Sequence, residues 1–391
     1  MASTPSPSKS VLVTGANGYI GNAVCRAFRR AGWHVYGLVR RSSGACALAA
    51  SEIIPVVGSV SADLSWLDAL LGSGTTFDAV VSCTENFPFA AHYAHILALL
   101  TRVAQHNRHH GRPKPLVLFS SGCKDYGTTP LHGSDRFAPH LETTPLDPPA
   151  ILRERAACAL DALAHPDLFD AAVVRPTPVY GYGSSYYATF FQVVSSIAAA
   201  ASQPGEGPKK KIRVPADLNT VIHGCHVDDC GEAYVALATH ADRGAVAGQC
   251  FNVSGRRYET LGELLGALGG AYGISFPSLI GDVVVVGPLG EGEEQGGGEA
   301  EMHPGAVLQL GYSQWVGSDK IRRLTGWTDT RTLLSEDARA YRAAYEAAVE
   351  RGDEGVARIQ ERVAGTLAGD AAWKKSGVYG SKEVGVRYIE G

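Results

Sequence analysis

The sequence predicts an α/β protein built on a doubly wound parallel sheet, and three observations support this. Six short apolar runs alternate with stretches whose apolar residues recur at three- and four-residue spacing. A glycine-rich turn joins the first run to the first helical stretch. The chain has 391 residues, 45% of them hydrophobic, which is enough for such a sheet plus a smaller second lobe.

The six apolar runs are expected to be the strands of the sheet. They cover residues 11–14, 34–39, 53–57, 78–83, 115–120 and 171–176. The helical stretches between them are "GNAVCRAFRRAG", "LSWLDALL", "HYAHILALLTRVAQHN" and "ILRERAACALDALAH". Strands that alternate with helices form β-α units, so we expect a parallel sheet with both faces covered.

The alternation becomes irregular after about residue 180, which predicts a small C-terminal lobe with some segments returning to the main sheet. A Gly- and Glu-rich stretch, 287–301, is expected to be a mobile surface loop. Helical periodicity near the end is broken at Gly352, which indicates two amphipathic helices. The predicted division is a disordered tail (1–9), the sheet domain (10–205), the smaller lobe (206–335) and a helical extension (336–391).

Composition excludes several classes of partner. The formal net charge is −4 and no long Lys/Arg run occurs, so nothing indicates binding to nucleic acid or an anionic membrane. The eight cysteines form no C-x-x-C pair and show no histidine spacing typical of zinc, so we expect reduced thiols and no metal. The N-terminus lacks an apolar core. We expect a cytoplasmic protein that binds a small-molecule substrate, with a homodimer as an open option.

The glycine-rich turn indicates a nucleotide site. In "VLVTGANGYIGNAVCRAF" three glycines follow the first strand and open the first helix. Glycines at this spacing let the chain turn tightly, approach a pyrophosphate and direct helix N–H groups at it. This context favours a Rossmann-type dinucleotide site over an ordinary glycine-rich turn. We expect cofactor contacts from Gly15, Asn17, Gly18, Tyr19, Ile20 and Gly21.

The end of the second strand, "GLVRRSS", indicates which dinucleotide binds. An acid there would accept hydrogen bonds from the ribose hydroxyls, whereas a base would hold a 2′-phosphate. Arg40 and Arg41 stand at this place, with no Asp or Glu. NADP(H) is therefore the expected cofactor. The alternative is that the two arginines only solvate the start of a helix.

Together with this turn, four further motifs carry a family resemblance. The chain resembles the extended short-chain dehydrogenase/reductase family, in particular its NAD-dependent epimerase/dehydratase-like group. The resemblance runs from about residue 10 to about residue 330. Its ordered motifs are "TGANGYIG" (14–21), "SSGCKDYG" (120–127), "RPTPVYG" (175–181), "HVDDCGEAYVAL" (226–237) and "KIRRLTGW" (320–327).

The resemblance implies further cofactor contacts. The family has an acid followed by an apolar residue around adenine, where this chain has Ser59 and Val60, so only the apolar contact is retained. Glu85 and Asn86 would face the substrate or the nicotinamide ribose. The other positions that would lie beside the cofactor are Cys83, Thr84, Pro176 and Val179.

The resemblance also implies a catalytic Ser or Thr, a Tyr that acts as acid or base, and a Lys one helical turn later. In "PPAILRERAACALDAL", Arg155 stands at the place of the Lys and Ile151 at that of the Tyr. Arg155 would still donate to the ribose hydroxyls. Ile151 cannot transfer a proton, so the usual mechanism does not carry over intact.

Replacement proton donors are expected near the fifth and sixth strands. The family's Ser or Thr position falls on Gly122, one residue past Ser121, which would either polarise the substrate or cap the strand. Lys124 and Asp125 would either pair with each other in water or leave Lys124 desolvated, with a lowered pKa and Tyr126 as its partner. The full set of donor candidates is Ser121, Cys123, Lys124, Tyr126, Tyr180 and Tyr182.

One more motif residue, His226, is expected to be structural, because the resemblance implies that this stretch packs the substrate lobe onto the core. A zinc site is not expected, because no third ligand lies at recognisable spacing.

Three functions stay open. The favoured one is NADPH-dependent reduction of a small organic carbonyl with a non-standard proton donor, because hydride transfer needs only a positioned nicotinamide and a polarised carbon. The residues of "PVYGYGSSYYATFF" indicate an apolar or aromatic substrate. The second is a non-redox isomerase, lyase or cyclase on the same fold. The third is an NADP(H)-sensing regulatory protein without turnover, which only the missing Tyr supports.

Overall fold

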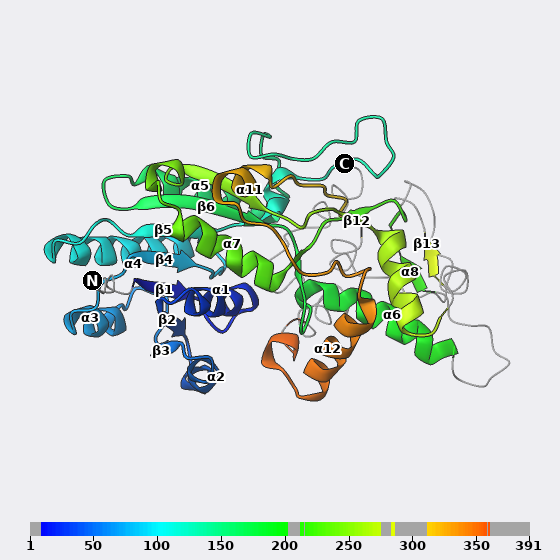
Figure 1. Cartoon of the computed structure of the whole chain (residues 1–391), viewed down its shortest axis with the longest axis horizontal. Coiled ribbons are helices and arrows are strands. Elements are labelled where there is room, and N and C mark those ends of the chain that lie inside the picture. The colour runs from blue at the N-terminus through cyan, green and yellow to red at the C-terminus, as the bar shows by residue number, and fades with distance from the viewer. Residues whose placement is uncertain are drawn as a thin grey trace, which may run out of the picture.

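A seven-stranded parallel sheet forms the centre of the computed structural model, which describes residues 9–201, 212–214, 216–274, 283–285, 311–357 and 359 (Figure 1). The strand order is β11-β6-β5-β4-β1-β2-β3. The order reverses at β1, which creates a crevice beyond the carboxyl ends of β1 and β4. The strands are β1 (Ser10–Thr14), β2 (His34–Val39), β3 (Ile54–Val57), β4 (Ala79–Ser82), β5 (Leu116–Ser120), β6 (Asp170–Pro176) and β11 (Gln249–Val253). The six predicted strands and the doubly wound Rossmann-type fold are confirmed.

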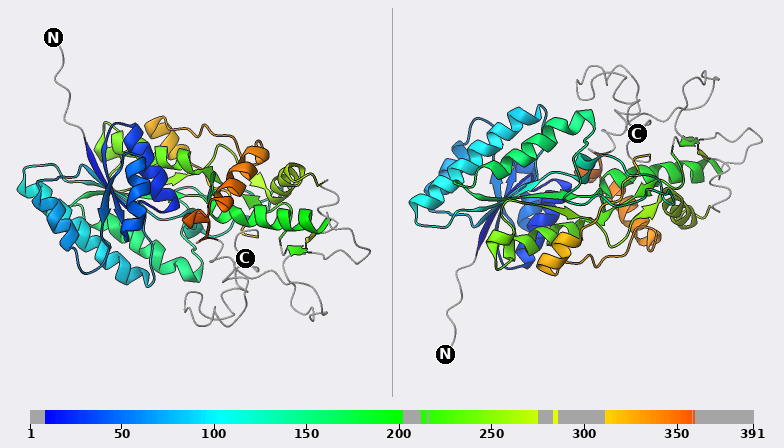
Figure 2. Two further views of the ribbon diagram at one scale, coloured as in Figure 1. Left: turned by 90° about the horizontal axis from the view of Figure 1, so that it is seen from below. Right: turned by 90° about the horizontal axis from the view of Figure 1, so that it is seen from above.

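Helices cover both faces of the sheet (Figure 2). Because side chains alternate along a strand, Val11 and Val13 pack under one layer of helices and Leu12 under the other. The first layer is α1 (Tyr19–Arg30), α7 (Val227–Thr239) and α11 (Asp319–Thr325), and the second is α3 (Ser65–Gly72), α4 (Phe89–His109) and α5 (Arg153–Asp161). The short α2 (Ala45–Ala50), which the sequence pattern did not predict, packs Leu48 into the first layer.

The second lobe has a core of its own, on the right of Figure 1. Phe191, Leu264 and Tyr345 pack together there from three helices, α6 (Ala188–Ala201), α8 (Leu261–Ala271) and α12 (Ala338–Glu350). Its strands pair in twos: β7 (Val179–Tyr180) with β10 (Cys225–His226), β9 (Val221–Ile222) with β12 (Glu259–Thr260), and β8 (Ile212–Val214) with β13 (Val283–Val285).

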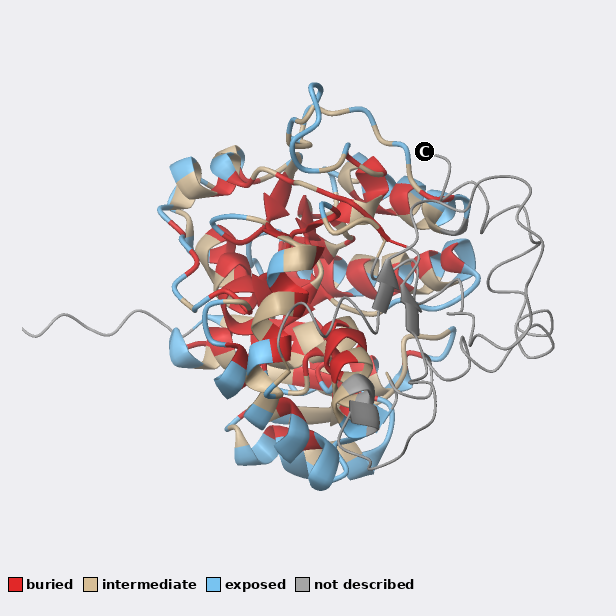
Figure 3. Cartoon of the chain, turned by 90° about the vertical axis from the view of Figure 1, so that its right-hand side faces the viewer, coloured by how far each residue is buried: buried red, intermediate tan, exposed pale blue. Residues whose placement is uncertain are grey.

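The chain passes from the sheet to the lobe and back. After β6 it enters the lobe, and it returns as β11, where Cys250 pairs with Val173 of β6 in parallel register. Figure 3 shows the buried strands enclosed by helices whose outer faces are exposed. The short 3-10 helices are η1 (Ser42–Gly44), η2 (Cys123–Tyr126), η3 (Ala150–Leu152), η4 (Ala162–Ala164), η5 (Ser185–Tyr187) and η6 (Arg243–Ala245).

Several predicted features lie outside the described residues, namely the tail up to residue 8, the loop over 287–301 and most of the extension beyond residue 357. Within the described part, α12 is followed by Gly352 in the left-handed region, with a φ of +66°. None of the described helices combines the length and apolarity that crossing a bilayer requires.

Candidate functional site

The turn between β1 and α1 forms a backbone cradle that only glycines can build. A Cβ atom on Gly21 would lie 2.2 Å from the carbonyl oxygen of Gly15, and Gly15 itself has a φ of +65°. The N–H of Gly18 donates to the same Gly15 oxygen at 2.8 Å. Gly18 is the N-cap of α1 but has no capping side chain, so the first N–H groups of the helix are left for a ligand. The cradle fits a pyrophosphate.

The end of β4 lies against this cradle. The Cys83 N–H donates to the hydroxyl of Thr14 at 3.2 Å, and the hydroxyls of Thr14 and Thr84 are also 3.2 Å apart. Burial raises the pKa of the Cys83 thiol to about 12, so the thiol stays protonated. The two strands therefore bring Gly15, Cys83 and Thr84 together, as the resemblance implied.

Other predicted cofactor residues surround the same edge of the sheet. Arg40 and Arg41 are exposed directly after β2. After β3, Val60 packs into the core, and the indole N–H of Trp66 donates to the Ser59 carbonyl at 3.0 Å. The remaining four are Asn17, exposed in the turn, Ile20, packed against the core, Pro176, at the end of β6, and Val179, in β7.

Tyr19 connects this turn to the second lobe. Its hydroxyl donates to the Gly181 carbonyl just after β7, and burial raises its pKa well above the usual value. On the same helix, Arg26 forms an ion pair with Asp228 at 2.7 Å, and the Tyr182 hydroxyl donates to that carboxylate at 2.5 Å. The cradle and the segment after β7 are thus linked by direct contacts.

Arg155 is held by a buried carboxylate, which corrects one expectation. Its Nη2 lies 2.6 Å from Asp125 Oδ1, and Asp125 is fully buried. The other carboxylate oxygen accepts from Ser121 Oγ at 2.5 Å and lies 3.5 Å from Arg175 Nε. The expected pairing of Lys124 with Asp125 in water is therefore wrong, because the buried carboxylate of Asp125 faces Arg155 and the buried Arg175. The Ser121 proton is also engaged, so Ser121 has a structural role here.

Tyr126 also does not take the role expected from the sequence. Its hydroxyl donates to Asn252 Oδ1 at 2.8 Å and accepts from Arg175 Nη1 at 3.0 Å, all in the core. Burial raises the pKa of the Tyr126 hydroxyl above its usual value. Tyr126 is thus neither the partner of Lys124 nor a proton donor to a ligand, because its hydroxyl is engaged by Asn252 and Arg175 in the core.

Three other donor candidates have structural partners. The buried Cys123 thiol donates to the Arg175 carbonyl at 3.0 Å, and the Tyr180 hydroxyl donates to the Thr332 carbonyl at 2.9 Å. Tyr182 is engaged with Asp228 as described. His226 caps α7 by accepting from the Asp228 N–H at 3.2 Å, a structural role as expected. Among the described residues no cluster of three metal-ligating side chains occurs.

The guanidinium of Arg155 covers Gly122. A Cβ on Gly122 would lie 3.3 Å from Arg155 Nη2, so the arginine fills the space next to this residue. Arg155 Nε is buried and has no hydrogen-bond partner among the described residues. It borders a small cleft that Thr84, Glu85 and Ser120 also line. This unpaired donor beside the carboxyl ends of β4 and β5 fits a ribose hydroxyl, as expected for Arg155.

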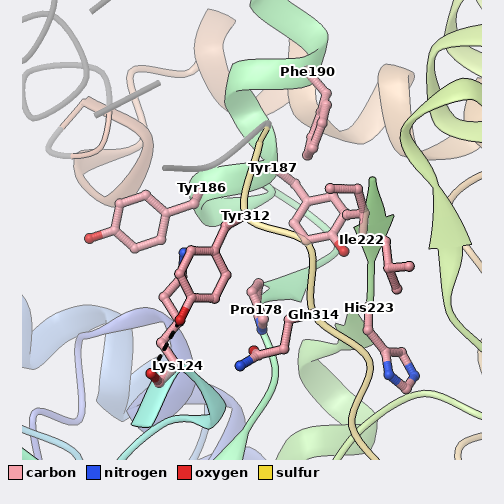
Figure 4. Close-up of a pocket in the computed structure, with 10 residues that line it drawn as sticks. Lys124, Pro178, Tyr186, Tyr187, Phe190, Ile222, His223, Tyr312 and Gln314 are labelled. Atoms are coloured by element: carbon pink, nitrogen blue, oxygen red, sulfur yellow. Dashed lines mark hydrogen bonds between the residues drawn. The ribbon is translucent and has the colours of Figure 1, made fainter. Parts of the chain in front are cut away.

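A second pocket lies between η2 and the second lobe (Figure 4). It measures about 360 Å³, its open mouth included. Its lining is aromatic and aliphatic apart from a few polar groups. The residues around it are Lys124, Pro178, Tyr186, Tyr187, Phe190, Val221, Ile222, His223, Tyr312 and Gln314.

Lys124 is the titratable group of this pocket whose pKa lies near neutral pH. Burial first, and then the charge of Arg155, lower its pKa to about 7. Its Nζ lies 4.0 Å from the centre of the Tyr312 ring, whose face stabilises the ammonium form. Burial lowers the pKa of His223 to about 4, and both of its ring nitrogens bond to backbone groups, so it is neutral and structural.

The sequence predicted part of this pocket. Pro178, Tyr186 and Phe190 come from the aromatic stretch that indicated an apolar or aromatic substrate. Tyr312 and Gln314 were missed, because they follow a Gly- and Glu-rich stretch and belong to no motif. The buried role of Asp125 was missed as well, since its partner Arg175 is fifty residues away in the chain.

Comparison with known proteins identifies the family. The model of the NAD dependent epimerase/dehydratase family matches residues 11–254. The chain belongs to this family.

Three solved structures illustrate the likeness. One is dTDP-glucose 4,6-dehydratase from Bacillus anthracis str. Ames in complex with NAD, with 17% identity over 88% of this chain and 98% of that chain and a TM-score of 0.62. The second is UDP-glucose-4-epimerase from Stenotrophomonas maltophila with bound NAD and formylated UDP-arabinopyranose, with 19% identity over 88% of this chain and 99% of that chain and a TM-score of 0.61. The third is RMD from Pseudomonas aeruginosa complexed with NADPH, with 16% identity over 87% of this chain and 100% of that chain and a TM-score of 0.57. At these identities they show the shared fold alone. No curated protein sequence matches the chain.

As a member of the epimerase/dehydratase family, the chain retains the glycine cradle and departs at the acid/base positions. A nicotinamide dinucleotide is the cofactor that the family and the cradle support. Position 151, where the family's Tyr would stand, lies in η3 and carries Ile. The proton donor of an enzyme on this scaffold must therefore come from another element.

Proposed function

We propose that the protein is an NADPH-dependent reductase of a small organic carbonyl compound and that Lys124 is its proton donor. The observation that carries the proposal is the Lys124 amine in an aromatic pocket, two residues beyond Gly122. The other donor candidates on η2 and after β6 are engaged in structural hydrogen bonds. A general acid works best when its pKa lies near the working pH, and that of Lys124 is about 7.

The residues that would hold the cofactor come from three strand ends and from helix α5. The cradle around Gly15 and Gly21 would take the pyrophosphate, and Arg155 Nε with Thr84 would contact the nicotinamide ribose. Arg40 and Arg41, exposed after β2, support a preference for the 2′-phosphate of NADP(H). When bound, NADPH supplies a hydride.

The chain itself would supply the proton and a dry environment. The Lys124 ammonium would give its proton to the carbonyl oxygen of the substrate, and the neutral amine would then regain a proton from water. The Tyr312 ring beside it favours the ammonium form before transfer. The apolar wall of Pro178, Phe190 and Ile222 would exclude water from the reacting groups.

The test is consumption of NADPH in the presence of a panel of aliphatic and aromatic aldehydes and ketones. Lys124→Met is expected to lower kcat by roughly 10²-fold or more, with NADPH affinity unchanged. Because the protonated amine is the active form, kcat/KM of the wild type should fall as pH rises above about 7. Lys114→Met, which changes an exposed lysine, is the matched control and should leave kcat unchanged.

Two outcomes would contradict the proposal. Product formation without net NADPH consumption would favour a non-redox isomerase, lyase or cyclase. Tight cofactor binding without turnover of any carbonyl would favour a regulatory role. The cofactor preference is tested on the same protein by fluorescence titration, and equal affinity for NADPH and NADH would contradict it.

A further inference from the structure

The hydroxyl of Tyr187 is buried in the pocket without a hydrogen-bond partner among the described residues. The residue is 1% exposed, and its ring is held between Tyr180 and Phe190, with centroid distances of 5.4 and 5.3 Å. Buried polar groups in native proteins are almost always satisfied, so an unsatisfied one needs an explanation. Its place in the lining of an open pocket provides one.

The surroundings of this hydroxyl keep it free of protein partners. A Cβ on Gly224 would lie 2.2 Å from Tyr187 Oη, so the absence of a side chain there makes room for the hydroxyl. The neighbouring polar groups are already engaged: His223 through both ring nitrogens, and Gln314 through its amide nitrogen, which donates to the carbonyls of Cys123 and Gly127.

The protonation state of Tyr187 makes it a permanent donor. Burial, followed by the negative charges that Glu259 and Cys225 would carry, raises its pKa well above the usual value. The hydroxyl therefore keeps its proton at neutral pH, and it can donate to an oxygen of a ligand.

The backbone before Tyr187 is strained. Tyr182, Ser184 and Ser185 all have left-handed φ angles, of +46°, +65° and +47°. Non-glycine residues in this region cost energy and cluster at ligand sites. This strained segment leads directly into η5, from which the Tyr187 ring enters the core of the second lobe.

We propose that the Tyr187 hydroxyl donates a hydrogen bond to the substrate, and that the substrate is an aromatic carbonyl compound with a second oxygen away from its reducible carbonyl. The identity of the reacting carbonyl rests on the proposed function, whereas the contact with Tyr187 does not. Figure 4 shows Lys124 and Tyr187 entering the pocket from different sides, with the Tyr312 ring beside Lys124 and Ile222 beside Tyr187. The aromatic and aliphatic lining of the pocket suits a flat aromatic ring.

The first arm of the test measures stability. Tyr187→Phe removes only the hydroxyl, so the midpoint of thermal unfolding should equal or exceed that of the wild type. The matched control is Tyr180→Phe, which loses the hydrogen bond to the Thr332 carbonyl and should unfold at a midpoint lower by about 1–2 °C. A similar loss in Tyr187→Phe would overturn the proposal, because it would mean that the hydroxyl already has a structural partner.

The second arm measures binding of defined ketones by ligand-observed NMR, without turnover. The probes are acetophenone, 4-ethylacetophenone, and acetophenones with a hydroxyl, methoxy or acetyl group at position 3 or 4. At least one oxygenated probe should bind the wild type about tenfold or more tightly than both probes that lack the second oxygen. Tyr187→Phe should abolish that difference and leave acetophenone binding unchanged.

The outcomes separate this inference from the proposed function. Lys124→Met should still bind the oxygenated probes more tightly than the probes without a second oxygen, even if no reduction by NADPH is detected. If no oxygenated probe binds more tightly than 4-ethylacetophenone, or if the advantage survives in Tyr187→Phe, the inference is wrong, whatever the activity of the protein.

Discussion

At the scale of single residues, the departures from the family pattern are coupled to one another. Arg155 is longer than the lysine that the family resemblance implies at this position, and its guanidinium lies over Gly122, where the family's Ser or Thr would project. Its charge is balanced by Asp125, which Arg175 also approaches. The loss of the catalytic hydroxyl, the change to arginine and the buried carboxylate therefore form one arrangement.

Replacement of Asp125 tests this arrangement. Asp125→Asn would leave Arg155 and Arg175 buried without their shared carboxylate, so the free energy of unfolding should fall by about 3–5 kcal/mol. Urea denaturation followed by circular dichroism measures it. The control is Glu85→Gln, because Glu85 is the half-exposed partner of Arg155 at 3.4 Å and should contribute less than about 1 kcal/mol. Equal losses in the two variants would contradict the arrangement.

Residue roles were predictable where a motif is local and not where partners come from distant elements. The glycines of the cradle and the place of Arg155 follow from short spacings. The engagement of Tyr126 does not, because its partner Asn252 lies on β11, 126 residues away in the chain. The sequence pattern therefore indicated the glycine turn that the structure contains, and also several proton donors that are engaged in structural hydrogen bonds.

At the scale of elements, strands were predicted more closely than helices. The six apolar runs correspond to β1 to β6 within a residue or two, because most of these strands are buried and a buried strand is apolar throughout. The helix expected over 151–165 is instead split into η3, α5 and η4. The six-residue α2, "ACALAA", has too few turns to show a helical period.

The β1–α1 turn allows a prediction at this scale. In Gly21→Ala the added Cβ would lie 2.2 Å from the Gly15 oxygen, so α1 must shift. The free energy of unfolding should fall by roughly 1–3 kcal/mol, and NADPH affinity by about tenfold or more, because the cradle widens. Gly72→Ala at the end of α3 is the control, since nothing lies within 4 Å of the added atom there. If chemical denaturation and fluorescence titration gave the same values for both variants, the cradle would not be as tight as described.

At the scale of the whole molecule, His223 joins three segments of the second lobe. It follows β9, its Nε2 donates to the Gly255 carbonyl at 3.0 Å, and its Nδ1 accepts from the Val316 N–H at 3.2 Å. Gly255 lies just beyond β11, so the imidazole connects the lobe to the strand that returns to the sheet. The sequence predicted a lobe with returning segments, but it could not reveal this connection, because the three segments are far apart in the chain.

This connection should make the free energy of unfolding depend on pH. Burial lowers the pKa of His223 from 6.5 to about 4, so between these values the unfolded chain binds a proton that the folded protein does not. The contribution of this group to stability is therefore complete above pH 6.5 and falls as pH decreases toward 4, by about 3 kcal/mol in all. His223→Gln cannot bind this proton. The amount by which its free energy of unfolding is lower than that of the wild type should therefore shrink by about 2 kcal/mol between pH 7 and pH 4.5 in urea titrations. His34→Gln, at an exposed position, should show the same small difference at both pH values. If the difference in free energy of unfolding between His223→Gln and the wild type did not change with pH, the imidazole would not be held in its neutral form between the lobe and the sheet.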